Sequence, residues 1–178
     1  LLKIYEHTGD KQKSLETLDR LEMQDGQSSA TTMAKIHIYD SMGEEKKALD
    51  ELRALADSHP LELDYRTILG NWLFGKGRYK EAQKEYSAVL AEDPDNENAM
   101  ISMIDYYQHE GQDSLAKDLH NRSLSSPKTQ TETKAFMLRQ AIRASEQNNG
   151  DTTEILAKFD LALQHQQLAG AVGHQLAG

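Results

Sequence analysis

The sequence lacks cysteine, long apolar runs and an excess of positive charge. Without cysteine there are no disulfide bonds and no thiolate zinc sites, although this absence does not select a compartment. No apolar run approaches the ~20 residues of a membrane-spanning helix, so we expect no membrane span. Asp and Glu number 29 against 20 Lys and Arg, and the longest basic cluster is Lys46 with Lys47. Because phosphate backbones are bound by clustered Lys and Arg, we expect no nucleic-acid partner.

Signatures of catalysis are also missing. The sequence has no G-x-S-x-G turn, no G-x-x-x-x-G-K-[ST] phosphate loop and no H-E-x-x-H helix. His37 and Asp40 lie three residues apart, but a metal site needs three or four ligands. We therefore expect no enzymatic activity, no cofactor and no metal site.

The sequence does contain a repeat of 34 residues. The interval separates successive members of two columns, one of glycines and one of small residues: Gly9, Gly43, Gly77 and Gly111, and Ser14, Ala48, Ala82 and Ala116. Pro60 and Pro94 are separated by the same interval. Several columns with one period indicate an array of units, each of which buries its apolar face against its neighbours.

Each unit has the pattern of two amphipathic helices. In residues 68–96, Leu69 and Leu73 share one face of a first helix, and Ala82 and Tyr86 share one face of a second. Gly77 separates them, as expected where the residue leaving a helix takes a positive φ that disfavours a side chain with Cβ. The pattern predicts a helical hairpin.

The stretch "LGNWLFGKGRYKEAQKEYSAVLAEDPDN" resembles a tetratricopeptide repeat, a helix-turn-helix unit of 34 residues. The positions that match the family pattern are Leu69, Gly70, Ala82, Tyr86 and Pro94. The positions that depart from it, each with a charged or ionisable side chain in a usually apolar or aromatic column, are Lys35, Arg66 and His120.

The resemblance implies an all-α fold, a right-handed α-solenoid of about five stacked units over residues 1–167. We place the units at about 1–28 (partial), 29–62, 63–96, 97–130 and 131–167, followed by a glycine-rich tail or linker at 168–178. The last unit is divergent, because Gly150 falls 39 residues after Gly111. The sequence enters midway through a repeat, so we expect a fragment of a longer chain.

In the family, the first helices of the hairpins line the concave side. Helical spacing then predicts an outward stripe on these helices: Lys3, Glu6, Met33, His37, Asp40, Thr67, Asn71, Phe74, Ile101, Asp105 and Gln108. The candidate peptide-binding residues within it are His37, Asp40, Asn71, Phe74, Asp105 and Gln108. For any one of them, an ordinary solvated helix face is the alternative explanation.

This stripe favours a non-catalytic scaffold that binds a peptide or partner protein in the concave groove. The alternative is an accessory or regulatory segment of a larger enzyme or cell-envelope assembly. Asp40, Asp64 and Asp105 favour a neutral or basic ligand, and the ends of the array favour self-association. The composition resembles that of bacterial tetratricopeptide proteins, which leaves both the cytoplasm and the cell envelope (periplasm) open.

Overall fold

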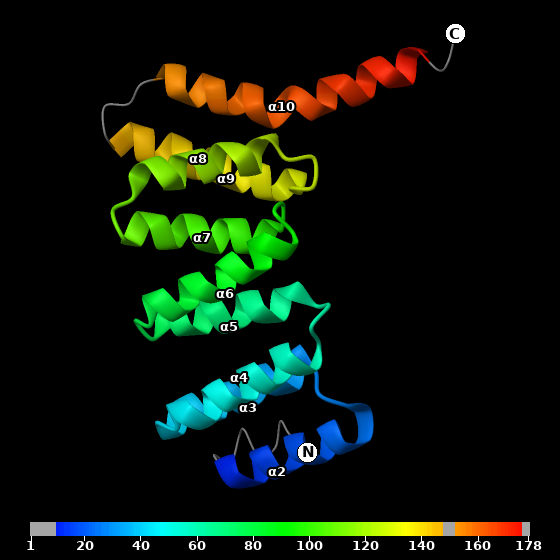
Figure 1. The fold of residues 1–178 in the computed structure, drawn as a ribbon, viewed down its shortest axis with the longest axis vertical. Helices are drawn as coiled ribbons and strands as arrows, with labels where there is room; N and C mark the ends of the chain where they lie inside the picture. Colours follow the sequence, from blue (N-terminus) through cyan, green and yellow to red (C-terminus); the bar gives the residue numbers. More distant parts are fainter. Residues whose placement is uncertain (1–9, 148–151, 176–178) are drawn as a thin grey trace. The chain divides into compact units, whose positions relative to one another are not determined.

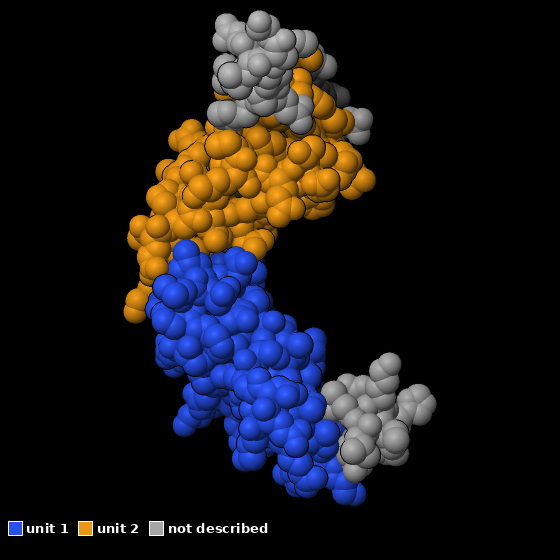
Figure 2. Space-filling view, turned by 90° about the vertical axis from the view of Figure 1, so that its right-hand side faces the viewer, with its two compact units in different colours: residues 1–77 blue, residues 78–178 orange. Residues whose placement is uncertain are grey.

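The structure is a computed structural model that describes residues 10–147 and 152–175. Every regular element in these ranges is an α-helix (Figure 1), which confirms the all-α prediction. Among the predicted repeat positions, Lys3, Glu6, Gly9 and Gly150 lie outside the described residues. The chain forms two compact units, residues 1–77 and 78–178 (Figure 2), whose boundary falls inside the predicted repeat 63–96.

The described part of the first unit consists of four helices: α2 (Lys11–Asp25), α3 (Ser29–Met42), α4 (Glu45–Ser58) and α5 (Leu63–Gly75). Each helix packs against the next one along the chain. Leu18, Ile36 and Leu52 come from three successive helices and are at most 2% exposed. Each helix thus buries its apolar face on its neighbours, as expected of a repeat array.

The described part of the second unit consists of five helices: α6 (Tyr79–Glu92), α7 (Glu97–His109), α8 (Asp113–Ser125), α9 (Thr131–Gln147) and α10 (Thr152–Gln175). Its core includes Ile104 of α7, Leu124 of α8, Met137 of α9 and Ala162 of α10. Helix α10 packs against both α8 and α9. It also includes residues 168–175 of the predicted tail or linker, and the division of the chain into repeats and tail stays a prediction.

The turns inside the hairpins depend on glycine. Gly43 and Gly111 have φ values of 74° and 67°, in the left-handed region that disfavours residues with a Cβ. The N–H of Gly43 donates to the carbonyl oxygen of Asp40, and the N–H of Glu44 donates to that of Tyr39. These bonds satisfy carbonyl groups at the end of α3 that have no partner inside the helix. Gly43 and Gly111 therefore lie where first helices end, as the sequence predicted.

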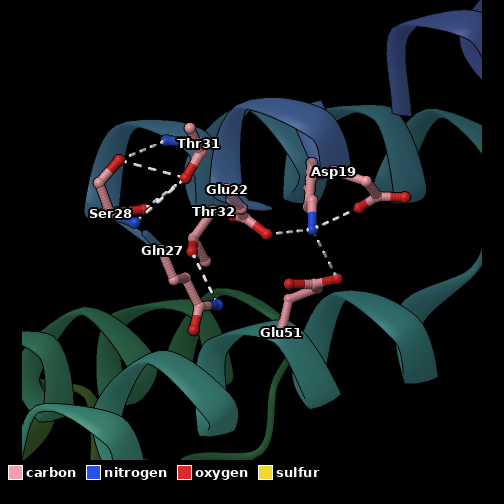
Figure 3. A network of polar contacts seen from close by, with 8 residues as sticks. Asp19, Glu22, Gln27, Ser28, Thr31, Thr32 and Glu51 are labelled. Carbon is pink, nitrogen blue, oxygen red and sulfur yellow. Dashed lines mark hydrogen bonds and ion pairs between the residues drawn. The ribbon is translucent and has the colours of Figure 1, made fainter. Parts of the chain in front are cut away.

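Lys35 is the charged residue that interrupts an apolar column of the repeat, and it is 3% exposed. Its Nζ lies 2.7 Å from Oδ1 of Asp19, 2.5 Å from Oε2 of Glu22 and 3.3 Å from Oε1 of Glu51 (Figure 3). A buried ammonium group is strongly unfavourable unless carboxylates compensate its charge. Here, two carboxylates from α2 and one from α4 surround a lysine of α3, so a single ionic cluster connects three helices.

The turn before α3 is stabilised by polar contacts beside this cluster (Figure 3). The N–H of Thr31 donates to Oγ of Ser28 at 3.2 Å, and the N–H of Ser28 donates to Oγ1 of Thr31 at 3.2 Å. This reciprocal capping box satisfies backbone donors at the start of the helix. The side-chain amide of Gln27 donates to Oγ1 of the buried Thr32. The start of α3, and with it the position of Lys35, is thereby held in place.

Candidate functional site

Two of the candidate binding residues, His37 and Asp40, lie on α3 of the first unit. The side chain of His37 is exposed. Oδ1 of Asp40 lies 2.8 Å from Nζ of Lys76, which also lies 3.6 Å from Oε1 of Glu45. The hydrogen bond to Asp40 is the main cause of a raised pKa at Lys76. The charge of Asp40 is therefore largely compensated inside the first unit.

Two other candidates, Asn71 and Phe74, lie on α5 of the same unit. Asn71 is exposed and Phe74 is half-buried. Thr67, which the sequence placed on the same outward stripe, is only 2% exposed. That placement was wrong, because Thr67 belongs to the part of α5 that is buried with Leu69, Gly70 and Leu73.

The last two candidates, Asp105 and Gln108, come together at a pocket in the second unit. The pocket has a volume of about 300 Å³ and is formed by residues of α7, α8, α9 and α10. Its described lining residues are Ile101, Ile104, Asp105, Gln108, His120, Phe136, Met137, Gln140, Ala141 and Lys158. Half of these residues are apolar, as is typical of sites that bind small groups or side chains.

The lining divides into a rim and an inner wall according to exposure. Phe136, Asp105 and Gln108 are exposed and form the rim. Ile104 and Met137 are 6% and 5% exposed and form the inner wall. An apolar group that enters past Phe136 therefore meets apolar atoms, while polar groups remain available at the rim.

Asp105 is the anionic group of the pocket. Its carboxylate forms no ion pair with any residue that the structure describes, and partial loss of hydration raises its pKa although the residue as a whole is exposed. Tyr86 of α6 lies close enough to respond to this charge, since burial first and then the Asp105 carboxylate raise the pKa of Tyr86 to about 12. Asp105 therefore differs from Asp40, whose negative charge is already compensated by Lys76.

Lys158 is the cationic group of the pocket, and its side chain is 14% exposed. Burial lowers its pKa, with a smaller contribution from Lys117, while Glu154 opposes the change. The Nζ of Lys158 lies 3.9 Å from Oε1 of Glu154, and the same oxygen lies closer to Lys117, at 3.1 Å. Lys158 thus shares the Glu154 carboxylate with Lys117, so its positive charge is compensated only in part.

His120 adds a polar but neutral group to the inner part of the pocket. Burial lowers its pKa to about 4, and the nearby Lys158 acts in the same direction. The imidazole is therefore uncharged at neutral pH. At that pH the ionised groups of the described lining are Asp105 and Lys158.

The sequence did not predict the part of the site that comes from α9 and α10. Phe136 and Gln140 follow Ile101 and Asp105 by 35 residues each, so a shift of one residue in the 34-residue period would have extended the stripe to α9. Lys158 has no such signal, because it lies in the second helix of its predicted hairpin. The predicted stripe contains residues of first helices only. The pocket exists only because α7, α8, α9 and α10 all contribute to its lining.

The described residues contain no group of three or more His, Cys, Asp or Glu side chains arranged to hold a metal ion. No helix in the described part of the chain combines the length and apolar character needed to cross a membrane.

Comparisons with solved structures identify the class of fold. A crystal structure of MamA aligns over 96% of this chain and 97% of its own, with a TM-score of 0.56 and 15% identity. PilF of Pseudomonas aeruginosa aligns over 92% of this chain and 72% of its own, with a TM-score of 0.58 and 18% identity. Both are helical solenoids of the tetratricopeptide type, and the fold of this chain belongs to that class.

A second MamA structure aligns over 70% of this chain and 68% of its own, with a TM-score of 0.50 and 20% identity. No protein-family model matches the sequence, and no curated protein matches it. The similarity therefore lies in the fold, and the site has to be argued from its own residues.

Proposed function

We propose that this chain is a non-catalytic protein-interaction module that binds a segment of a partner protein in the pocket formed by α7, α8, α9 and α10. The observation that carries the proposal is the combination of an exposed aromatic rim at Phe136 with a buried apolar wall at Ile104 and Met137. A pocket of about 300 Å³ can accommodate one large apolar side chain. Asp105 and Gln108 then offer polar contacts to the backbone or neighbouring residues of the same segment.

The solenoid fold supports this proposal on physical grounds. Stacked hairpins expose extended first-helix surfaces, and such surfaces suit an extended peptide or a partner helix. Large apolar side chains that enter a well-packed pocket contribute most of the affinity at protein interfaces. The pocket in the second unit is therefore the expected anchor point, and His37, Asn71 and Phe74 of the first unit stay predicted contacts.

The direct test is selection from a library of random peptides displayed on phage, with the full chain as bait. The recovered peptides are synthesised, and their affinities are measured by fluorescence anisotropy. Replacing Phe136 by alanine should weaken binding about tenfold or more, because the rim then loses its main apolar contact. The same change at Phe159, a 37% exposed phenylalanine of α10 that does not line the pocket, should leave binding unchanged.

Circular dichroism melting of both variants controls for folding, since both side chains are partly exposed and neither should shift the melting temperature much. Equal losses of affinity for Phe136→Ala and Phe159→Ala would place the binding surface elsewhere. Failure to recover any peptide that binds in the pocket would contradict the proposed function itself.

A further inference from the structure

The two charges of the pocket occupy different places. Asp105 is exposed at the rim, whereas the Lys158 side chain is 14% exposed and lies deeper. Asp105 forms no ion pair with a described residue, and Lys158 lies 3.9 Å from a carboxylate that binds Lys117 more closely. The pocket is therefore negative at its entrance and positive inside.

This polarity restricts what can enter the pocket. A lysine or arginine side chain that inserted fully would bring its cation toward Lys158, and like charges in a poorly hydrated space repel each other strongly. An uncharged apolar side chain meets no such barrier and contacts Ile104 and Met137. The interior of the pocket thus disfavours a cationic anchor, and its apolar wall favours an apolar one.

The entrance has the opposite preference. The Asp105 carboxylate has no ion-pair partner among the residues that the structure describes, and its surroundings already remove part of its hydration. A cation that reaches it gains an attraction that is stronger than the same contact in bulk water. A neighbouring acidic group on the ligand would be repelled.

We infer that the pocket recognises a two-part motif in the partner, an uncharged apolar anchor residue with a lysine or arginine close to it in the chain. The anchor fills the pocket between Phe136 and Met137, and the basic residue pairs with Asp105 at the rim. This inference rests on the proposed function and specifies its ligand. Asp105 and Lys158 then determine the specificity of binding, and the apolar wall supplies most of the affinity.

The test uses the peptides recovered with the full chain, each remade with its basic residue replaced by glutamine or by glutamate. The wild-type protein should bind the basic form about fivefold more tightly than the glutamine form, the size of effect expected for one partly exposed ion pair. The glutamate form should be weaker still. The difference should shrink as the salt concentration rises.

The variant Asp105→Lys should reverse this order and bind the glutamate form most tightly, with a change of preference of about tenfold or more. Asp118→Lys is the matched control, because it makes the same change of charge at an exposed residue of α8 that does not line the pocket. The near-isosteric Asp105→Asn provides a second variant that should fold even if Asp105→Lys does not, and it should remove the preference.

Equal affinities for the basic, glutamine and glutamate peptides, with binding still sensitive to Phe136→Ala, would overturn this inference and leave the proposed function standing. An equal effect of Asp118→Lys and Asp105→Lys would also overturn it, because the preference would then come from the overall charge of the protein. Peptides that bind without any sensitivity to Phe136→Ala would overturn both the proposed function and this inference.

Discussion

Replacing Lys35 by methionine should destabilise the first unit more than an ordinary surface change does. Methionine has nearly the same length and volume, so no large cavity forms. The change removes the cation that lies 2.5–3.3 Å from the carboxylates of Asp19, Glu22 and Glu51. Three negative charges then face one another around an apolar side chain.

The magnitude follows from how well each charge is hydrated. The side chain of Lys35 is 4% exposed, but the side chains of its partners Glu22, Glu51 and Asp19 are 15%, 21% and 53% exposed. Exposed ion pairs contribute about 0.2–1 kcal/mol, whereas removing one partner of a fully buried pair costs about 3–5 kcal/mol. Because the cation is buried and the anions are partly hydrated, we expect a loss of about 2–4 kcal/mol in the free energy of unfolding.

The assay is urea unfolding followed by far-UV circular dichroism, combined with native-state hydrogen exchange of the α3 amides. Hydrogen exchange is needed because repeat arrays open locally. The loss of stability in Lys35→Met should be concentrated in the first unit. Adding Glu22→Gln to Lys35→Met should restore part of the loss, since one of the unpaired carboxylates disappears. A double-mutant cycle measures this coupling.

Glu51→Gln provides an internal contrast. Burial raises the pKa of Glu51 and, together with repulsion from Glu22 and Asp19, exceeds the opposing effect of Lys35. A raised folded pKa means that ionisation of Glu51 disfavours the folded state as the pH rises above its unfolded pKa. Glu51→Gln should therefore change the free energy of unfolding by less than about 1 kcal/mol at neutral pH.

For Lys35→Met, a loss below about 0.5 kcal/mol in the free energy of unfolding would refute the argument that the carboxylates hold this cation.

Predictions at other residues test the second unit, the glycine turns and the assignment of core positions. His120 has a folded pKa of about 4, below its ordinary value of 6.5, so the unfolded state binds more protons between these values and stability should fall as the pH is lowered through them. The full shift would correspond to about 3 kcal/mol, and partial hydration of the ring reduces the expected loss to about 1–2 kcal/mol; an unchanged pH slope in His120→Gln, measured by urea unfolding, would contradict this. Gly43→Ala should cost about 1 kcal/mol in thermal unfolding through backbone strain alone, because φ is 74° and nothing lies within 4 Å of an added Cβ. Gly75→Ala, in a helix without that φ, should be neutral or stabilising, and equal effects of the two changes would refute the strain argument. Ala82→Arg should cost about 3 kcal/mol or more, because Ala82 is 0% exposed, and an unchanged melting temperature would show that the position is not part of a packed core.

Much of the fold could be predicted from the sequence, because the information is local. The turn at Gly43 needs only its own φ and two hydrogen bonds within six residues, so the 34-residue column of glycines predicted where the first helices end. Ala48 and Ala82, in the column of small residues, are both 0% exposed. The irregular spacing after Gly111 made the last repeat harder to define, and α10 runs on to Gln175.

The candidate site could be predicted only in part. Asp105 and Gln108 do line a pocket, but helical spacing alone also placed the buried Thr67 on the outward stripe. Spacing identifies a helix face and does not say which neighbour covers it. Phe136 and Lys158 were missed, since their place in the pocket depends on how α9 and α10 pack against α8.

The sequence by itself determined the helical hairpins, their glycine turns and the apolar positions of the repeat, because these depend on contacts within one unit and recur at one interval. Only the tertiary structure decided which charges are compensated: Lys35 has partners from two other helices and Asp40 pairs with Lys76 directly after α5, whereas Asp105 has no ion-pair partner among the described residues. The physical reason is that the energy of a charge depends on its distance to other charges and to water, and helices distant in sequence set both.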